Sequence, residues 1–286
     1  MKQNNNINQE IARIKNLPPL PEESVTILTA INNPDISIDE LVKVISASPV
    51  LVARLLGLAN SAYFGCAGKI TDLRRAIIQV LGLNLVKSLV LSIVINLELD
   101  TSKCPLFDTN YFWSHALATA FIAQKLAIQI KEEQLEQSTV YTSSLLLNVG
   151  LLAAVQCFPD KTNEVLSRSD RIEGTVSKLM TEVVGKTQYE IGEILLARWQ
   201  LPEVYRVVLK EFRNKNFSGK ERKMIELLEF SHWLGAHVIS DKEDQVIDLS
   251  DMMQALALPK KDLDKVVEDI NNNKDNINEL AIVIGG

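Results

Sequence analysis

The sequence predicts an all-α protein, and three observations support this fold class. Apolar residues recur with helical periodicity along the chain, and hardly any stretch alternates in the manner of a strand. Two capping boxes, Ser37 to Glu40 (SIDE) and Thr187 to Glu190 (TQYE), mark helix starts. The stretch from Thr139 to Phe158 contains no charged residue, which is typical of a helix buried on every side. We expect this stretch to form the central helix around which the others pack.

The first predicted helices are separated by short breaks that carry proline, asparagine or serine. Pro21 stands in the first turn of a helix that ends at residues 32–35 (NNPD). The capping box at Ser37 opens the next helix. A third begins at Ser48-Pro49, carries leucines on one face and ends at residues 60–65 (NSAYFG). A fourth runs from Thr71-Asp72 to about residue 81.

Residues 76–97 have about the length of a membrane span, but several polar residues interrupt them. Gly82-Leu83-Asn84 is typical of a helix stop followed by a new N-cap. We therefore predict two buried helices and no membrane-spanning segment. The polar residues 100–105 follow and end in proline, so we place the boundary there between an N-terminal lobe, 1–105, and a second lobe, 106–286.

The second lobe is also predicted to be helical throughout. A long helix begins near Tyr111, carries Trp113 and His115, and ends near Ile130. The uncharged central helix follows after a polar turn. The remaining predicted helices are one from Thr187 that carries Trp199, then 204–212, 224–239 with His232 and His237, 250–258 and 261–270.

Composition limits the classes of function. The net charge of −6 argues against a dedicated nucleic-acid-binding protein, for which a basic surface is expected. The three cysteines have no metal-ligand spacing, and their sparse use together with the lack of an apolar leader favours a reducing cytoplasm. The chain contains no glycine-rich phosphate loop of the common types.

Several blocks of the sequence resemble the HDOD (HD-related output domain) family. The resemblance covers roughly residues 10–280, and it implies an all-α fold in two packed parts and a role in bacterial signalling. The second part is expected to resemble the helical bundle of HD phosphohydrolases. The matching blocks are 17–21 (LPPLP), 33–35 (NPD), 53–65 (ARLLGLANSAYFG), 70–83 (ITDLRRAIIQVLGL), 112–120 (FWSHALATA), 189–192 (YEIG) and 198–199 (RW).

The resemblance also implies where metal ligands of an HD hydrolase would lie. Such enzymes hold a divalent ion with an early His, an adjacent His-Asp pair and a later Asp, and the bound water then attacks phosphate. His115 falls at the early position, but Leu147 and Asn148 replace the pair. Gln188 stands where a further family histidine is frequent, and His232 lies near the later aspartate. At most two of the four ligand positions retain a donor, so we predict no metal site, no cofactor, no catalytic residue and no enzymatic activity.

We therefore expect the protein to act as a non-catalytic signalling module through contact with another protein. The turn that ends the third helix, with Asn60, Ser61, Tyr63, Phe64 and Gly65, is the candidate contact surface, because turns on a rigid scaffold often carry function. Arg54, in the same block, is included. The alternative is that this turn only closes its helix and packs on a neighbour.

Two other functions stay open at this point. The first is a metal-dependent phosphohydrolase with rearranged ligands around His115, Asn148 and His232, which predicts bound metal and turnover. The second is a non-catalytic nucleotide sensor that binds in the groove between the lobes, which predicts stabilisation by the ligand. If neither holds, we expect His115 to be a hydrogen-bonded histidine of the core or groove and Asn148 to be a buried amide bonded to a neighbouring helix.

Overall fold

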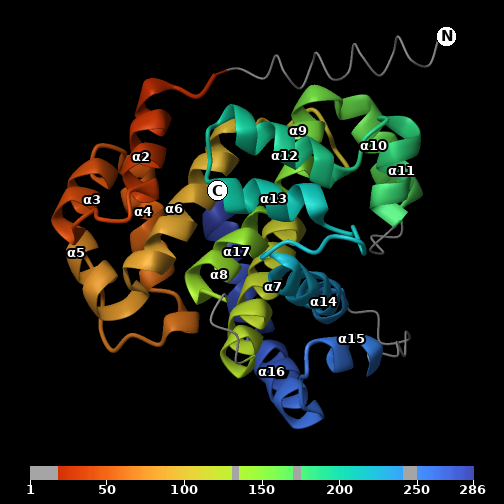
Figure 1. Ribbon diagram of the computed structural model, residues 1–286. Helices are drawn as coiled ribbons and strands as arrows, with labels where there is room; N and C mark the ends of the chain where they lie inside the picture. Colours follow the sequence, from red (N-terminus) through yellow and green to blue (C-terminus); the bar gives the residue numbers. More distant parts are fainter. Residues whose placement is uncertain (1–18, 131–134, 170–174, 241–249) are drawn as a thin grey trace.

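The computed structural model describes residues 19–130, 135–169, 175–240 and 250–286, and within these ranges all regular structure is helical (Figure 1). The prediction of an all-α fold is therefore confirmed. The N-terminal elements are α2 (Glu22–Asn32), α3 (Ile38–Ile45), α4 (Pro49–Ala59), η1 (Ala62–Phe64), α5 (Leu73–Arg75), η2 (Ala76–Leu81) and α6 (Leu83–Glu98). They are followed by α7 (Thr109–Gln129), α8 (Gln137–Leu146), α9 (Val149–Cys157), α10 (Pro159–Arg168), α11 (Thr175–Val183), α12 (Gln188–Arg198), α13 (Glu203–Glu211), α14 (Arg222–Ile239), α15 (Ser250–Ala255), α16 (Lys260–Asn272) and α17 (Lys274–Gly285).

Both predicted capping boxes are present. The Ser37 hydroxyl accepts from the Glu40 backbone N–H at 3.2 Å, and the Glu40 carboxylate accepts from the Ser37 N–H at 2.9 Å. Thr187 and Glu190 repeat this exchange at the start of α12, at 3.2 and 2.8 Å. Each box satisfies two backbone groups that the first turn of a helix leaves without an intrahelical partner.

The predicted break at Gly82 is also confirmed. The helical segments Leu73–Leu81 and Leu83–Glu98 meet there at an angle of 117°. Gly82 has a φ of 78°, which glycine adopts without strain. Its N–H donates to the carbonyl of Ile77 at 2.8 Å, so η2 ends in a wide, π-type turn that the sequence pattern did not indicate.

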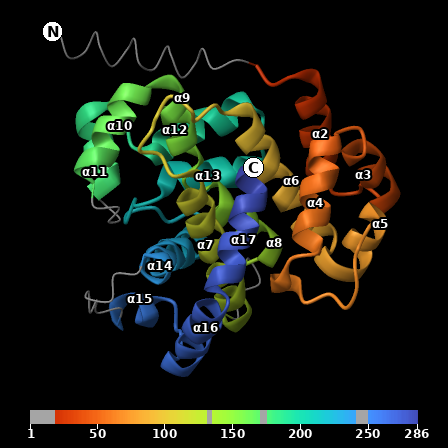
Figure 2. The same ribbon diagram turned by 180° about the vertical axis from the view of Figure 1, so that it is seen from behind.

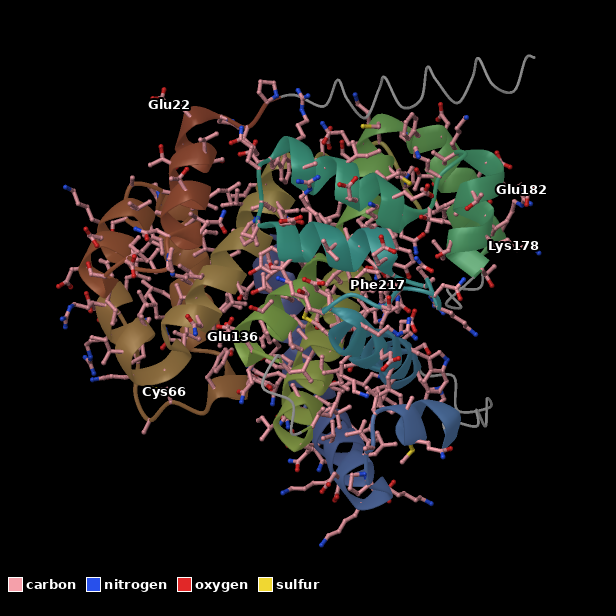
Figure 3. The ribbon with its side chains drawn as sticks, in the orientation of Figure 1. Glu22, Cys66, Glu136, Lys178, Glu182 and Phe217 are labelled. Carbon is pink, nitrogen blue, oxygen red and sulfur yellow. The ribbon has the colours of Figure 1, made fainter. Side chains whose placement is uncertain are left out.

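The helix at the centre of the fold is α7 rather than the uncharged stretch 139–158. It contacts α8, α14, α16 and α17, and it lies between them in both views (Figures 1 and 2). Small buried residues along it, such as Ala116, Ala120 and Ala123, let neighbouring helices approach from several sides. Charged side chains such as Glu22 and Lys178 lie on the outside of the arrangement (Figure 3).

The expectation of a single helix over Thr139 to Phe158 is wrong. α8 ends at Leu146 and α9 begins at Val149, with a break at Leu147 and Asn148. Asn148 has a φ of −101° and a ψ of 11°, which lie outside the helical range. The Leu147 N–H donates to Ser144 O at 3.3 Å and the Leu151 N–H to Asn148 O at 2.8 Å, so the chain tightens into turns of three residues.

The run Gln137–Cys157 is nevertheless long and apolar enough, by length and composition alone, to cross a membrane. Burial accounts for this, since 78% of its apolar window lies inside the fold. The lack of charged residues in this segment is therefore explained by its burial in the core.

The last helix, α17, was not predicted, and it holds the N-terminal elements against α7. It contacts α4, α6, η1 and α7, and Figure 2 shows it alongside α6 and α7. Arg54 donates to the carbonyl of Ile284, and the Asn96 amide donates to Gly285 O at 2.8 Å, so α4 and α6 both cap the end of α17. The predicted lobe boundary at residues 100–105 lies between α6 and α7, and the division into two lobes stays a prediction.

Candidate functional site

Four of the predicted HD-type positions lie around one pocket. His115 on α7, Asn148 at the break between α8 and α9, Gln188 at the start of α12 and His232 on α14 all line it. Leu147 does not: it is fully buried in the core beside the pocket. The cavity has a volume of about 90 Å³. The described residues that line it are Leu106, Phe107, Asp108, Tyr111, Phe112, His115, Asn148, Leu151, Leu166, Ser169, Val176, Gln188, His232 and Ala236.

A close contact between α9 and α12 brings Asn148 and Gln188 to this pocket. A Cβ atom on Gly150 would lie 1.9 Å from the Gln188 carbonyl oxygen and 2.3 Å from the Gly192 backbone nitrogen. Both distances are far below van der Waals contact, so the two helices can approach this closely only because residue 150 is glycine. This close approach places Asn148, two residues before Gly150, near the start of α12, where Gln188 lies.

Two histidines form the floor of the pocket. His115 Nε2 lies 2.9 Å from the carbonyl oxygen of His232, and the two rings stack with centroids 4.5 Å apart. Because a carbonyl oxygen only accepts, Nε2 of His115 carries the proton, and Nδ1 holds the lone pair. The expectation that His115 is a hydrogen-bonded core or groove histidine is confirmed.

The pKa values of both histidines are lowered. Burial lowers the pKa of His115, and only its bond to the His232 carbonyl acts in the opposite direction. Burial lowers the pKa of His232 well below its usual range, and the neighbouring His115 and Arg213 lower it further. Both imidazoles are consequently neutral at pH 7.

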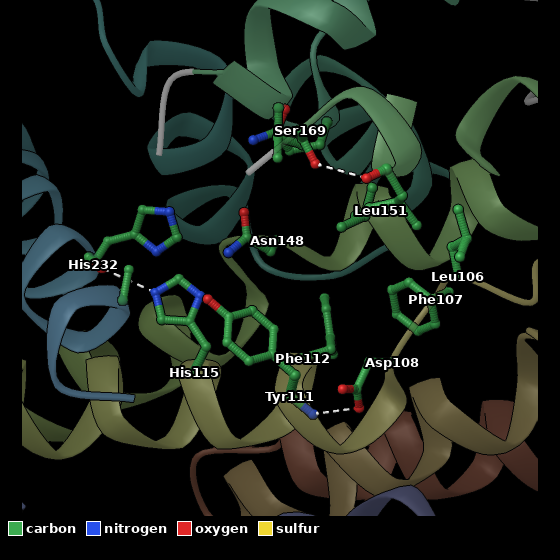
Figure 4. A pocket seen from close by; sticks show the side chains of 14 residues that line it. Leu106, Phe107, Asp108, Tyr111, Phe112, His115, Asn148, Leu151, Ser169 and His232 are labelled. Carbon is green, nitrogen blue, oxygen red and sulfur yellow. Dashed lines mark hydrogen bonds between the residues drawn. The ribbon is translucent and has the colours of Figure 1, made fainter. Parts of the chain in front are cut away.

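Two side-chain amides face the histidines. Gln188 is only 4% exposed; its Nε2 donates to Ser177 Oγ at 2.8 Å, whereas its Oε1 is buried with no hydrogen-bond partner in the described part of the chain. Asn148 is half-buried, and not buried as expected, because its side chain extends into the cavity (Figure 4). Beside the two imidazoles, the cavity therefore presents the neutral amide of Asn148.

Comparisons with known proteins match this arrangement. The HDOD domain profile matches residues 17–214. The chain belongs to the HDOD domain family. An uncharacterised protein of Treponema pallidum is 28% identical to this HDOD protein over 224 residues, which are 77% of this chain and 42% of that protein.

Solved structures share the fold. A Marinobacter aquaeolei protein, named as a candidate signal transduction protein, has a TM-score of 0.79 at 23% identity, with 98% of this chain and 66% of that chain covered. A Shewanella amazonensis protein, named as a candidate phosphohydrolase, has a TM-score of 0.75 at 22% identity, with 96% and 97% covered. An HDOD domain protein of unknown function from Geobacter sulfurreducens has a TM-score of 0.73 at 20% identity, with 97% and 96% covered. The chain spans less than half of its Treponema relative and about two thirds of the Marinobacter chain.

The residues around the pocket of this HDOD protein do not fit a divalent metal ion. His115 can offer only Nδ1 to an ion, because its Nε2 donates to a carbonyl. The amides of Asn148 and Gln188 are neutral, and the lining carboxylate of Asp108 caps α7 by accepting from the Tyr111 N–H at 2.9 Å. Within the described ranges, no three His, Cys, Asp or Glu side chains are placed to hold a metal together.

Several lining residues were not predicted as site residues. Tyr111 is four residues before His115 on α7, and Ala236 is four residues after His232 on α14, so helical spacing alone puts each on the face that lines the pocket. The loop before α7 brings Phe107, for which the sequence offers no comparable signal.

The second predicted site, the turn after α4, is held by its own side chains. The Asn60 amide donates to the carbonyls of Leu56 and Ile70, both at 2.7 Å, and its oxygen accepts from the Ile70 N–H at 2.8 Å. The Ser61 hydroxyl is buried. Gly65 is exposed and has a φ of 57°.

The aromatic pair in this turn is half-buried. Tyr63 stacks on Phe121 of α7 with centroids 4.4 Å apart, and Phe64 meets Tyr63 edge-on at 5.1 Å. Burial raises the pKa of Tyr63 and lowers that of Arg54, which contacts the end of α17. These residues support the packing of the N-terminal helices on α7 and α17. The exposed members of the turn are Asn60, Ala62 and Gly65.

Proposed function

We propose that this HDOD protein is a cytoplasmic bacterial signalling module that does not hydrolyse phosphate esters and acts through contact with another protein. The donor set of the pocket is the observation that carries the proposal. Phosphoester hydrolysis in an HD-type site depends on a metal that activates water, and metal binding needs several converging anionic or lone-pair donors. Here the pocket presents neutral amides and neutral imidazoles, and His115 can offer only one ring nitrogen, Nδ1, to an ion.

Membership of the HDOD family and the likeness in fold to a candidate signal transduction protein support a regulatory role. The likeness in fold to a candidate phosphohydrolase supports the alternative, a hydrolase with rearranged ligands. That alternative needs His115, Asn148 and His232 to share one ion. His115 could offer only Nδ1, because its Nε2 donates to the His232 carbonyl, and the neutral amide of Asn148 is a weak ligand for the same ion.

The first experiment measures metal content and turnover together. The purified, tag-free protein is analysed for bound metal and assayed against a phosphodiester with added Mn²⁺, with His115→Ala as the comparison. We expect substoichiometric metal and no turnover in either protein. Stoichiometric metal with turnover, both lost in His115→Ala, would overturn the proposal in favour of the hydrolase.

The protein-contact half of the proposal needs variants that leave the packing intact. Tyr63 is unsuitable because it stacks on Phe121. Ala62 is exposed in the turn, whereas Ala53 is exposed on α4 outside the turn, so Ala62→Glu and Ala53→Glu form a matched pair. We expect Ala62→Glu to lose a protein that co-purifies with the wild type, and Ala53→Glu to keep it. Equal retention by both variants would remove the turn as the contact surface.

A further inference from the structure

The helices α12 and α13 form an exposed hairpin with a groove along it. α12 ends at Arg198 and α13 begins at Glu203, and two packed helices joined by so short a turn run antiparallel. Figure 1 shows them side by side on the near face of the molecule, with no other described helix in front of them. The groove has a volume of about 430 Å³, and the described residues that line it are Lys186, Glu190, Glu193, Ile194, Glu203, Arg206, Val207 and Lys210.

The groove has an apolar floor between charged rims. Ile194 and Val207 are half-buried, so part of each side chain faces solvent. Arg206 bridges the two helices, because its Nε and Nη2 donate to Glu193 Oε1 at 3.3 and 3.0 Å. An apolar strip with charged residues on both sides is typical of a helix face that packs against further helices.

Two charges at opposite ends of α13 differ from the other charges of the groove. Glu203 pairs with no cation in the described ranges, and Lys210 Nζ makes one long contact, of 3.9 Å, with Glu211. The Lys210 side chain is 70% exposed. The remaining rim charges pair within the chain, as Lys186 does with Glu190 at 3.4 Å. The charges of Glu203 and Lys210 can therefore reach a second molecule.

The spacing of these two charges makes the exposed face of α13 complementary to itself. Glu203 and Lys210 are seven residues apart, so they lie on one face of the helix, about 10 Å apart along its axis. Arg206 and Val207 lie midway between them. When a second α13 crosses the first in the antiparallel direction at this midpoint, Lys210 of each copy meets Glu203 of the other. A twofold axis forms both contacts at once, because an isologous interface repeats every pair.

We propose that two copies of this HDOD protein associate through the groove between α12 and α13, with their hairpins packed face to face around a twofold axis. The apolar floors formed by Ile194 and Val207 meet at the centre, and Lys210 and Glu203 pair at both ends. The described lining residues comprise three cations and three anions, so the groove itself does not favour a strongly acidic or strongly basic partner. The inference is independent of the turn after α4 and of the histidine pocket.

The size of this face predicts a weak, reversible dimer. α12 and α13 have 11 and 9 residues, so the hairpin is about 16 Å long and roughly 20 Å wide. Its face of roughly 320 Å² is less than half of the roughly 800 Å² that each partner buries in a stable interface of standard size. We therefore expect a dissociation constant of about 10–100 μM.

Sedimentation of the purified full-length chain tests the association directly. Between about 5 and 500 μM, a range that includes the expected dissociation constant, the mass should rise from 31.9 kDa towards twice that value. Raising the salt concentration from about 0.05 to 0.5 M should weaken the dimer, because salt screens exposed ion pairs.

Charge reversal locates the interface. Lys210→Glu places like charges opposite each other at both ends of the dimer, so we expect at least about tenfold weaker association. The double variant Lys210→Glu/Glu203→Lys restores opposite charges and should associate within about threefold of the wild type. The exposed residues Lys261 and Glu268 on α16 have the same spacing outside the groove, so Lys261→Glu is the matched control and should leave association unchanged.

A mass of 31.9 kDa at every concentration would overturn the inference. So would a dimer that Lys210→Glu and Lys261→Glu affect equally, or one that the double variant does not restore. Circular dichroism checks that each variant is folded, and Glu203→Lys, which reverses the other member of the pair, repeats the test if Lys210→Glu melts early. A monomeric protein leaves the proposed function unaffected, because that function depends on other residues.

Discussion

The contact between Gly150 and Gly192 allows a prediction whose size follows from the structure. In Gly150→Ala the new Cβ would lie 1.9 Å from Gln188 O, 2.3 Å from Gly192 N and 2.9 Å from Gly192 Cα. All three atoms belong to the backbone, so no side chain can turn aside and α9 must separate from α12. Overpacking of this kind typically lowers the free energy of unfolding by about 1–3 kcal/mol. We expect a loss of about 3 kcal/mol or more here, because the higher helix propensity of alanine offsets at most about 1 kcal/mol.

Gly57→Ala is the matched control. Gly57 also lies within a helix, and its Cβ would meet the Val283 side chain at ordinary contact distances, 3.4 Å to Cγ1 and 3.9 Å to Cγ2. We expect an unchanged or slightly raised stability, by at most about 1 kcal/mol. Thermal unfolding followed by circular dichroism should place Gly150→Ala roughly 6–12 °C below the wild type. If Gly150→Ala melts together with Gly57→Ala, the helices do not approach as closely as the structure shows, and the position of Gln188 at the pocket is in doubt.

Three further predictions concern the histidines and the turn after α4. The fold lowers the pKa values of His115 and His232. Below about pH 6.5, the ordinary pKa of histidine, the unfolded chain therefore takes up protons that the folded chain does not. The free energy of unfolding should consequently fall as the pH falls, by up to about 1.4 kcal/mol per pH unit for each histidine. His232→Phe should reduce this slope in urea titrations between pH 7 and 5, and an unchanged slope would contradict the assignment of neutral histidines. Asn60→Ala removes three hydrogen bonds to the backbone, so we expect it to lower the free energy of unfolding by about 1–2 kcal/mol. An unchanged midpoint of urea unfolding would contradict this. Tyr63→Ala removes the ring that stacks on Phe121, so we expect it to lower the free energy of unfolding by about 2–4 kcal/mol. A loss below about 0.5 kcal/mol would indicate that the ring does not contribute to the packing.

Local sequence signals predicted those features that local chemistry decides. The capping boxes at Ser37 and Thr187 specify helix starts because their partners lie three residues away. Gly82 specified a break because only glycine adopts its φ without strain. The gathering of His115 and His232 in one pocket is different: it followed from the family resemblance, since these residues are 117 positions apart and no local rule connects them.

Features decided by tertiary contacts were missed or misread. The apolar run around Leu147 contains no proline, so the sequence does not indicate the helix break at Asn148. We attribute this break to the close contact between α9 and α12 at Gly150, which is a tertiary feature. The helix α17 follows a polar stretch and was not recognised, although its buried face joins α4 to α7. The bond from His115 Nε2 to a backbone carbonyl is not visible in any sequence pattern, and it leaves Nδ1 as the ring nitrogen of His115 with a lone pair.

Leu147 gives the break between α8 and α9 a packing that depends only on protein atoms. A histidine at a fully buried position needs a metal or a hydrogen-bond partner, because a polar group without one is costly to bury. Leucine needs neither, and its burial contributes about 1.5–3 kcal/mol by itself. With Leu147 in the core, only Asn148 of this pair faces the cavity. Leu147 therefore stabilises the break between α8 and α9 through its own burial, whereas a histidine at this position would need a partner.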